Sequence, residues 1–202
     1  VTALASGFPL AASPVLAQAT KTDSKGLVAG AVDVPVADGK IPAYRALPDK
    51  PGKFPTILVI QEIFGVHEHI QDVCRRLAKL GYYAIAPELF ARQGDVSKMN
   101  DIGQILKDVV SKVPDAQVMS DLDATVAFAK ASKKADTAHV GAVGFCWGGR
   151  TVWLYAAHNP SLKAGVAYYG LLDGMKSEIK ARDPIDIGAT LKVPVLGLYA
   201  EL

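Results

Sequence analysis

The sequence has 202 residues, of which 50% are hydrophobic and 21% are charged, and these values suit one globular α/β domain. The formal net charge is +2 and no run of lysine and arginine forms a basic arm, which argues against a nucleic-acid-binding protein. Two cysteines are too few for a disulfide framework, and the four histidines lack the spacing of a metal site. We therefore expect no metal and no other cofactor.

Residues 1–19 differ from the rest of the chain because they carry no charge and are mostly small or apolar. They close with Ala17-Gln18-Ala19 and are followed by polar Thr20, an order typical of the apolar core and cleavage site of an export signal. No positive segment precedes the apolar run, so we expect the sequence to begin inside the signal. Glycine and prolines interrupt the run, so a membrane span is not expected. The prediction is an exported protein, periplasmic or secreted; the alternative is an apolar extension with no signal function.

Strand and helix patterns alternate along the rest of the chain. Residues 28–36 and 41–47 are predicted strands joined by a turn containing Asp38-Gly39, which is a hairpin signal. Residues 56–60 form an unbroken apolar run, as expected of a strand buried on both faces. The other predicted strands are 82–87, 139–143, 164–169 and 193–199, and the predicted helices are 69–80, 102–113, 118–131 and 150–158.

This order predicts an α/β fold in which an N-terminal hairpin precedes a mainly parallel sheet with helices on both faces. We expect a single domain over residues 20–202. The strand pattern at 193–199 lies so close to residue 202 that we expect this domain to be incomplete at its C-terminus.

The stretch Gly-Phe-Cys-Trp-Gly-Gly at residues 144–149 lies between a predicted strand and a predicted helix. It matches the nucleophile-elbow pattern G-x-S-x-G with Cys146 at the nucleophile position. The helix N-terminus favours a thiolate and an oxyanion, and the backbone N–H of Trp147 is placed to bind developing negative charge. The alternative is a buried structural cysteine, which does not require these glycines. Cys74 falls on the apolar face of its helix and is expected in the core.

Two other polar side chains follow predicted strands. Glu62 comes soon after the strand 56–60, and Arg92 comes after the strand 82–87. Ligands of open α/β sheets bind at the carboxyl ends of the strands, where the elbow also lies, so Glu62 is expected to approach Cys146. Arg92 has the geometry to clamp a carboxylate with two hydrogen bonds. A solvated loop carboxylate and an ordinary surface arginine are the alternatives, and position alone does not exclude them.

Several motifs occur in the order seen in one known family. The chain resembles the dienelactone hydrolase family at Gln61-Glu62-Ile63-Phe64-Gly65, Ala91-Arg92-Gln93, residues 144–149 and Tyr168-Tyr169-Gly170. The resemblance runs from about residue 28 to the end of the sequence. It implies an α/β-hydrolase fold and a Cys-His-Asp triad with Cys146 as nucleophile.

The resemblance also implies roles for other residues. Glu62 would hold the resting thiol neutral and then take its proton. Ile63 and Trp147 would supply the oxyanion-hole N–H groups. Arg92 would pair with a substrate carboxylate, and Tyr169 would contact the substrate.

The triad acid and histidine of the family lie beyond the strand 193–199, and the sequence has no matching position for either. His139 and His158 do not fit the missing role, because one precedes the elbow strand and the other lies down the following helix. We therefore expect this piece alone to be poorly active.

The function implied is hydrolysis of lactones or small carboxylic esters through an acyl-enzyme, with a small-molecule substrate as partner and the oligomeric state left open. Two alternatives are a redox-reactive thiol protein and a non-catalytic binding module on the same scaffold. The glycine-framed elbow and Glu62 favour the hydrolase, because a thiol sensor needs neither.

Overall fold

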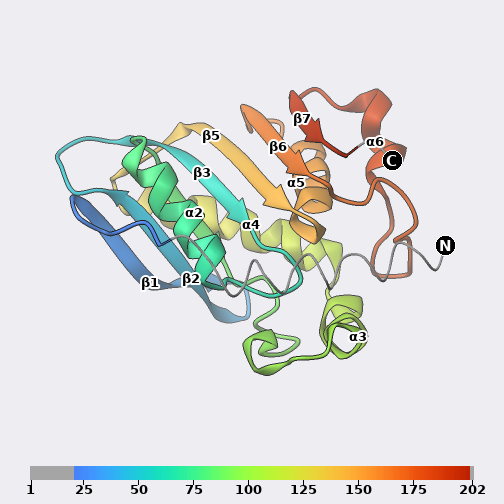
Figure 1. Cartoon of the computed structure of the whole chain (residues 1–202). Coiled ribbons are helices and arrows are strands. Elements are labelled where there is room, and N and C mark those ends of the chain that lie inside the picture. Colours follow the sequence, from blue (N-terminus) through green and yellow to red (C-terminus); the bar gives the residue numbers. More distant parts are fainter. Residues whose placement is uncertain (1–20, 201–202) are drawn as a thin grey trace.

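The computed structural model describes residues 21–200, in which seven strands form one sheet in the order β1-β2-β4-β3-β5-β6-β7 (Figure 1). The predicted export signal lies outside the described residues. The strands are β1 (Leu27–Val36), β2 (Gly39–Pro48), β3 (Phe54–Ile60), β4 (Tyr83–Pro87), β5 (Ala135–Phe145), β6 (Ala164–Tyr168) and β7 (Val195–Leu198).

Strand directions follow the alternation seen in the sequence. β1 and β2 form an antiparallel hairpin, and β2 also runs antiparallel to β4. All the other neighbours in the sheet, from β4 through β3, β5 and β6 to β7, are parallel. The predicted architecture, a mainly parallel sheet preceded by a hairpin, is confirmed.

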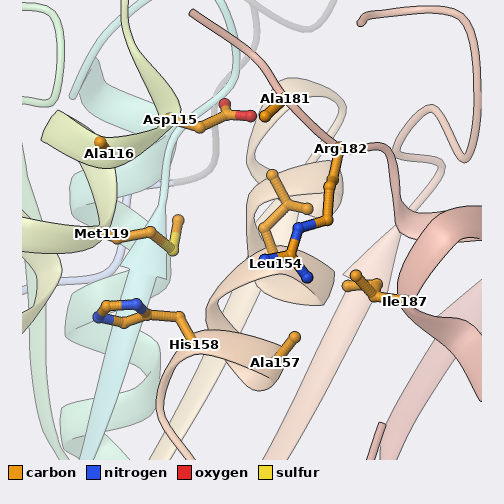
Figure 2. Close-up of a pocket in the computed structure, with 9 residues that line it drawn as sticks. All are labelled: Asp115, Ala116, Met119, Leu154, Ala157, His158, Ala181, Arg182 and Ile187. Atoms are coloured by element: carbon orange, nitrogen blue, oxygen red, sulfur yellow. The ribbon is translucent and has the colours of Figure 1, made fainter. Parts of the chain in front are cut away.

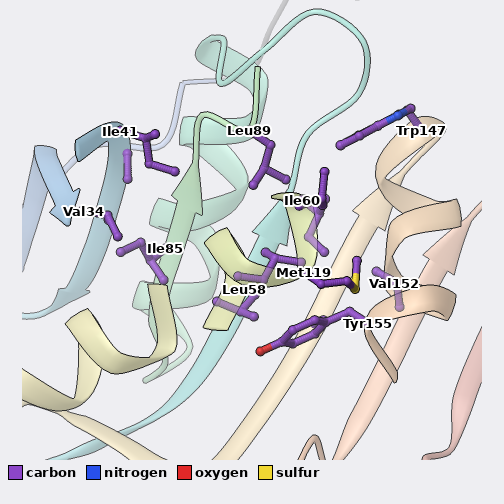
Figure 3. Close-up of a cluster of buried hydrophobic side chains, with 14 of the residues drawn as sticks. Val34, Ile41, Leu58, Ile60, Ile85, Leu89, Met119, Trp147, Val152 and Tyr155 are labelled. Atoms are coloured by element: carbon purple, nitrogen blue, oxygen red, sulfur yellow. The ribbon is translucent and has the colours of Figure 1, made fainter. Parts of the chain in front are cut away.

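Helices cover both faces of this sheet. They are α2 (Glu68–Lys79), α3 (Ile102–Gln104), α4 (Asp115–Ala131), α5 (Trp147–His158) and α6 (Pro184–Ile187). α2 packs Ile70 and Cys74 into an apolar cluster on one face, so Cys74 lies in the core as predicted. α4 and α5 bury Met119 and Tyr155, among others, in the larger cluster on the opposite face (Figure 3). Apolar area removed from water on both faces is the main term that stabilises such a layered fold.

The predicted helix over residues 102–113 is wrong as a single α-helix. Only Ile102–Gln104 is α-helical; a π-helical turn covers Ile105–Val109 and a 3-10 turn covers Val110–Lys112. Val109 and Val110 are both buried. Neighbouring residues point about 100° apart on an α-helix, so a local change of helical winding lets both valines reach the core.

The parallel register brings the carboxyl ends of three strands to one level. Ile60 of β3 lies opposite Gly144 of β5, and Phe145 of β5 lies opposite Tyr168 of β6. The residues that follow these strands therefore emerge side by side at one edge of the sheet. Among the described residues, no helix is both long enough and apolar enough to cross a membrane.

Candidate active site

Cys146 occupies a sharp turn between β5 and α5. Its backbone has φ 53° and ψ −116°, a left-handed conformation that side chains other than glycine rarely adopt. The Cys146 backbone N–H donates to the carbonyl oxygen of Tyr168 at 3.0 Å, which ties the turn to the end of β6. Strained backbone of this kind persists only where the surrounding structure holds it, and it is common at functional sites.

Steric contacts explain the glycines of the elbow. A Cβ atom added to Gly144 would overlap the backbone carbonyl of Gly148, and one on Gly148 would overlap the carbonyl of Ile60. A Cβ atom on Gly149 would lie 2.6 Å from the carbonyl oxygen of Tyr168. Each missing side chain therefore lets α5 start close against the ends of β3, β5 and β6, as the elbow pattern requires.

The Cys146 thiol is half-buried, and its pKa is raised above the ordinary value. Burial is the largest cause, and the negative charge of Glu62 raises the pKa further. A hydrogen bond from the backbone N–H of Trp147 acts in the opposite direction. The expected preference of the helix N-terminus for a thiolate is therefore outweighed, and the neutral thiol is the resting form at neutral pH.

Glu62 lies two residues beyond the end of β3 and is almost fully buried. It follows β3 at the level of the elbow, because Ile60 of β3 lies opposite Gly144 of β5, and its charge acts on the Cys146 thiol. Its Oε2 atom lies 3.0 Å from Nε2 of His67. The placement is the one the strand order predicts, and the catalytic role of Glu62 remains a prediction.

The loop that carries Glu62 is fixed by two residues whose part in the site the sequence did not reveal. Gln61 is fully buried and donates through Nε2 to Oε1 of Glu88 at 2.8 Å. The other oxygen of Glu88 accepts from the backbone N–H of Val66 at 2.7 Å. Glu88 directly follows β4, so this bridge couples the loops after two neighbouring strands and restricts where Glu62 can lie.

Tyr169, at the end of β6, also lies at this edge. It is half exposed and has φ 40°, a second left-handed residue beside Cys146. Burial of its hydroxyl raises the pKa of Tyr169 to about 12, and the charges of Glu62 and Cys146 contribute to the rise. The Ile63 side chain is buried in the core. The predicted roles of Tyr169 and of the Ile63 N–H remain predictions.

Arg92 has partners within the protein. Its guanidinium donates to both oxygens of Asp38 in the β1–β2 turn, at 2.6–2.9 Å. It also donates to both oxygens of Asp121 on α4, at 2.7 and 3.0 Å. Two carboxylates thus already occupy the fork that was expected to clamp a substrate. This pairing gives Arg92 a structural role and argues against the predicted one.

Two histidines form carboxylate pairs away from the elbow. Nε2 of His158 lies 2.7 Å from Asp123, and Nδ1 of His139 lies 2.7 Å from Asp136. His158 is the last residue of α5 and Cys146 precedes the first, so at ~1.5 Å per residue about 18 Å of helix separates them. His139 lies about 20 Å before the end of β5 at ~3.3 Å per residue.

A cavity of about 210 Å³ opens between α4, α5 and α6 (Figure 2). Met119, Leu154 and His158 line it, together with Arg182 from the segment before α6. None of the residues predicted for the site borders this cavity. Within residues 21–200, no three His, Cys, Asp or Glu side chains cluster in a way that could hold a metal ion.

Comparison with known proteins identifies one family. Residues 41–202 match the model of the family described as "Dienelactone hydrolase family". The chain is 68% identical over 199 residues to a Methylorubrum extorquens protein named "Putative carboxymethylenebutenolidase", and these residues cover 98% of the chain and 68% of that protein. A protein of the same name from Escherichia coli O157:H7 is 50% identical over 198 residues, covering 98% of the chain and 73% of that protein.

A solved structure shows the same fold. The crystal structure titled "Putative Dienelactone Hydrolase from Klebsiella pneumoniae" superposes with a TM-score of 0.83 at 53% sequence identity, covering 86% of this chain and 72% of that one. The chain belongs to the dienelactone hydrolase family, a family of α/β-fold hydrolases that act on ester bonds.

Proposed function

We propose that this protein hydrolyses lactones or small carboxylic esters through an acyl-enzyme formed on Cys146. The observation that carries the proposal is the elbow itself. Cys146 is held at φ 53° between β5 and α5, and the carboxylate of Glu62 lies close enough to act on its thiol. A nucleophile with an adjacent base is the arrangement that covalent acyl transfer needs.

The first half of the proposed reaction uses residues of this edge. Glu62 accepts the proton of the Cys146 thiol, and the thiolate attacks the carbonyl carbon of the ester. The backbone N–H groups of Trp147 and Ile63 stabilise the negative carbonyl oxygen of the tetrahedral intermediate. The ester C–O bond then breaks, the leaving oxygen takes the proton that Glu62 holds, and the acyl group stays on sulfur. In a lactone the leaving oxygen remains attached to the acyl group, so the ring opens.

The second half adds water to the thioester and returns the thiol. That step needs a general base to take a proton from water. His139 lies inside β5, six residues before its end, and His158 lies at the far end of α5, so neither suits this step. We assign the step to the triad histidine and aspartate that the family pattern places after the strand at residues 193–199.

The raised pKa of Cys146 favours this proposal over a redox role. A thiol sensor needs a lowered pKa and an accessible thiolate, because the thiolate is the form that oxidants attack. Burial and Glu62 instead keep Cys146 protonated until a base accepts its proton. A hydrolase tolerates this, since Glu62 supplies the base when substrate arrives.

The test is ester hydrolysis by the complete gene product that contains this sequence. Wild type, Cys146→Ala and Cys74→Ala are compared on a dienelactone and on p-nitrophenyl acetate. Cys74→Ala is the matched control because this second cysteine lies in the core, on the buried face of α2. We expect Cys146→Ala to lose at least about a thousandfold in kcat/KM, as nucleophile removal does, and Cys74→Ala to stay within a few-fold of wild type. Equal rates for wild type and Cys146→Ala on both substrates would show that the elbow does not hydrolyse these esters and would favour a binding or redox role.

Export is proposed from the composition of residues 1–19 alone. Cleavage after Ala19 leaves Thr20 as the first residue of the mature protein. N-terminal sequencing of the protein from the periplasmic or extracellular fraction tests this. An uncleaved protein confined to the cytosol would refute it.

A further inference from the structure

His67 lies beside Glu62 and has no part in the mechanism above. Its Nε2 atom is 3.0 Å from Oε2 of Glu62, and the two side chains are only 19% and 11% exposed. Within residues 21–200, this is the only side-chain hydrogen bond made to the Glu62 carboxylate. A hydrogen bond shielded from water in this way is stronger than one on the surface.

The start of α2 decides which nitrogen of His67 carries the proton. His67 caps this helix, and its Nδ1 atom accepts from the backbone N–H of His69 at 3.4 Å. In a neutral imidazole one nitrogen accepts and the other donates, so the proton sits on Nε2, which faces Glu62. A neutral His67 therefore donates to the carboxylate and cannot take a proton from it. That geometry suits an anchor rather than a proton relay.

Other titratable groups surround this pair. Cys146 and Tyr169 lie on the Glu62 side, where each feels the charge of the carboxylate. The His69 ring stacks on the His67 ring with centroids 6.1 Å apart. Glu88 lies behind the loop, and both of its oxygens already accept hydrogen bonds from the loop.

We propose that His67 is a positioning residue that anchors the Glu62 carboxylate beside the Cys146 thiol. The inference rests on the proposed function, in which Glu62 must stay close enough to accept the thiol proton. His67 occupies Oε2, so Oε1 remains for the proton. Without the anchor, the carboxylate is free to turn toward water and away from the sulfur.

Two amide substitutions separate the anchor from the helix cap. Gln places its side-chain nitrogen about where Nε2 of histidine lies, so His67→Gln keeps the donor to Glu62. Asn is a preferred N-cap residue, and its shorter side chain reaches the Nδ1 position but falls short of Glu62. His67→Asn therefore keeps the cap and loses the anchor, and His67→Gln does the reverse.

The measurement is the pKa of Cys146 in this chain, taken from the pH dependence of iodoacetamide alkylation. Mass spectrometry of the modified peptides separates Cys146 from Cys74, and thermal unfolding reports the state of the helix cap. Four variants are needed: Glu62→Gln, His67→Asn, His67→Gln and the double variant of Glu62→Gln with His67→Asn.

We expect Glu62→Gln to lower the pKa of Cys146, because the charge that opposes the thiolate is removed, and to speed its alkylation about tenfold at a pH below that pKa. His67→Asn should also speed alkylation, by about threefold, because the unanchored carboxylate repels the thiolate less. It should add nothing in the Glu62→Gln background, because a residue that acts through Glu62 has no effect once the carboxylate is gone. His67→Gln should alkylate like wild type even if its melting temperature falls.

Four results would overturn the anchor. The first is an alkylation rate of Cys146 in His67→Asn that is the same as in wild type or slower. The second is an equal increase from His67→Asn in the wild-type and Glu62→Gln backgrounds. The third is a His67→Gln variant whose alkylation rate changes as much as that of His67→Asn. The fourth is a Glu62→Gln variant whose alkylation rate equals that of wild type, in which case the anchor fails together with the role of Glu62 in the proposed function. If Glu62→Gln speeds alkylation and His67→Asn does not, the anchor alone fails. Loss of ester hydrolysis in Cys146→Ala is measured separately, so each failure is distinguishable.

Discussion

One methyl group at Gly148 tests the packing that forms the elbow. In Gly148→Ala the new Cβ atom would overlap the carbonyl oxygen of Ile60 and lie 2.5 Å from that of Gln61. Both oxygens are backbone atoms at the end of β3, a strand with neighbours on both sides. They cannot rotate away as a side-chain tip can, so α5 and β3 must separate.

The expected cost follows from two opposing terms. Overpacking of this kind costs about 1–3 kcal/mol, and backbone atoms put Gly148 at the upper end of that range. Alanine is about 1 kcal/mol more favourable than glycine within a helix, which offsets part of the cost. We expect a net loss of about 2 kcal/mol, or a melting temperature about 4–8 °C lower for a domain of this size.

The assay is thermal unfolding followed by circular dichroism, with urea unfolding as the second measure. Gly188→Ala is the matched control, because Gly188 has helical φ and ψ of −54° and −43° and no atom lies within 4 Å of its added Cβ. We expect this control to melt at or slightly above the wild-type temperature. If Gly148→Ala melts within about 1 °C of wild type, the elbow does not depend on this close approach and the steric account is wrong.

Three further predictions concern charge. Arg150 is fully buried and pairs with Asp115 and Asp183, so Arg150→Met should leave two carboxylates without their partner and cost about 3–5 kcal/mol in urea unfolding. Asp183 has a lowered pKa despite its burial, because the Met175 N–H and Arg150 stabilise its charge. Asp183 therefore stabilises the fold at pH values above the ordinary Asp pKa, and this stability is lost as the pH falls through the lowered pKa. In Arg150→Met, the free energy of unfolding should depend less steeply on pH in this acidic range. An unchanged pH dependence would show that Arg150 is not the cause of the lowered pKa. Alkylation of wild-type Cys146 should titrate above the ordinary thiol pKa, and a midpoint near pH 6 would contradict the neutral resting thiol and favour a redox role.

The elements that carry the candidate site could be predicted because their signals are local. The glycine frame around Cys146 reflects contacts within a few residues and against the adjacent strand ends. The position of Glu62 follows from strand order, because a parallel sheet gathers its carboxyl ends at one edge. Neither prediction requires the identity of a distant side chain.

What could not be predicted depends on pairs that are far apart in the sequence. Arg92 and Asp38 are 54 positions apart, and nothing around Arg92 indicates that two internal carboxylates occupy its guanidinium. The Gln61–Glu88 bridge spans 27 positions. The position of His67 beside Glu62 has no local signal either, because the contact depends on how the loop folds back before α2.

The electrostatics of the edge support the proposed nucleophile role of the half-buried Cys146. Before proton transfer the pair of Cys146 and Glu62 carries one negative charge, on the carboxylate, and after transfer it carries one, on the sulfur. The proposed step therefore never requires the site to hold two buried charges, which would be far more costly. The Trp147 N–H lowers the pKa of Cys146 and is also the predicted oxyanion donor. When sulfur bonds to the carbonyl carbon, the negative charge moves from sulfur to the carbonyl oxygen. The Trp147 N–H can then donate its hydrogen bond to this oxygen, because the sulfur is no longer charged.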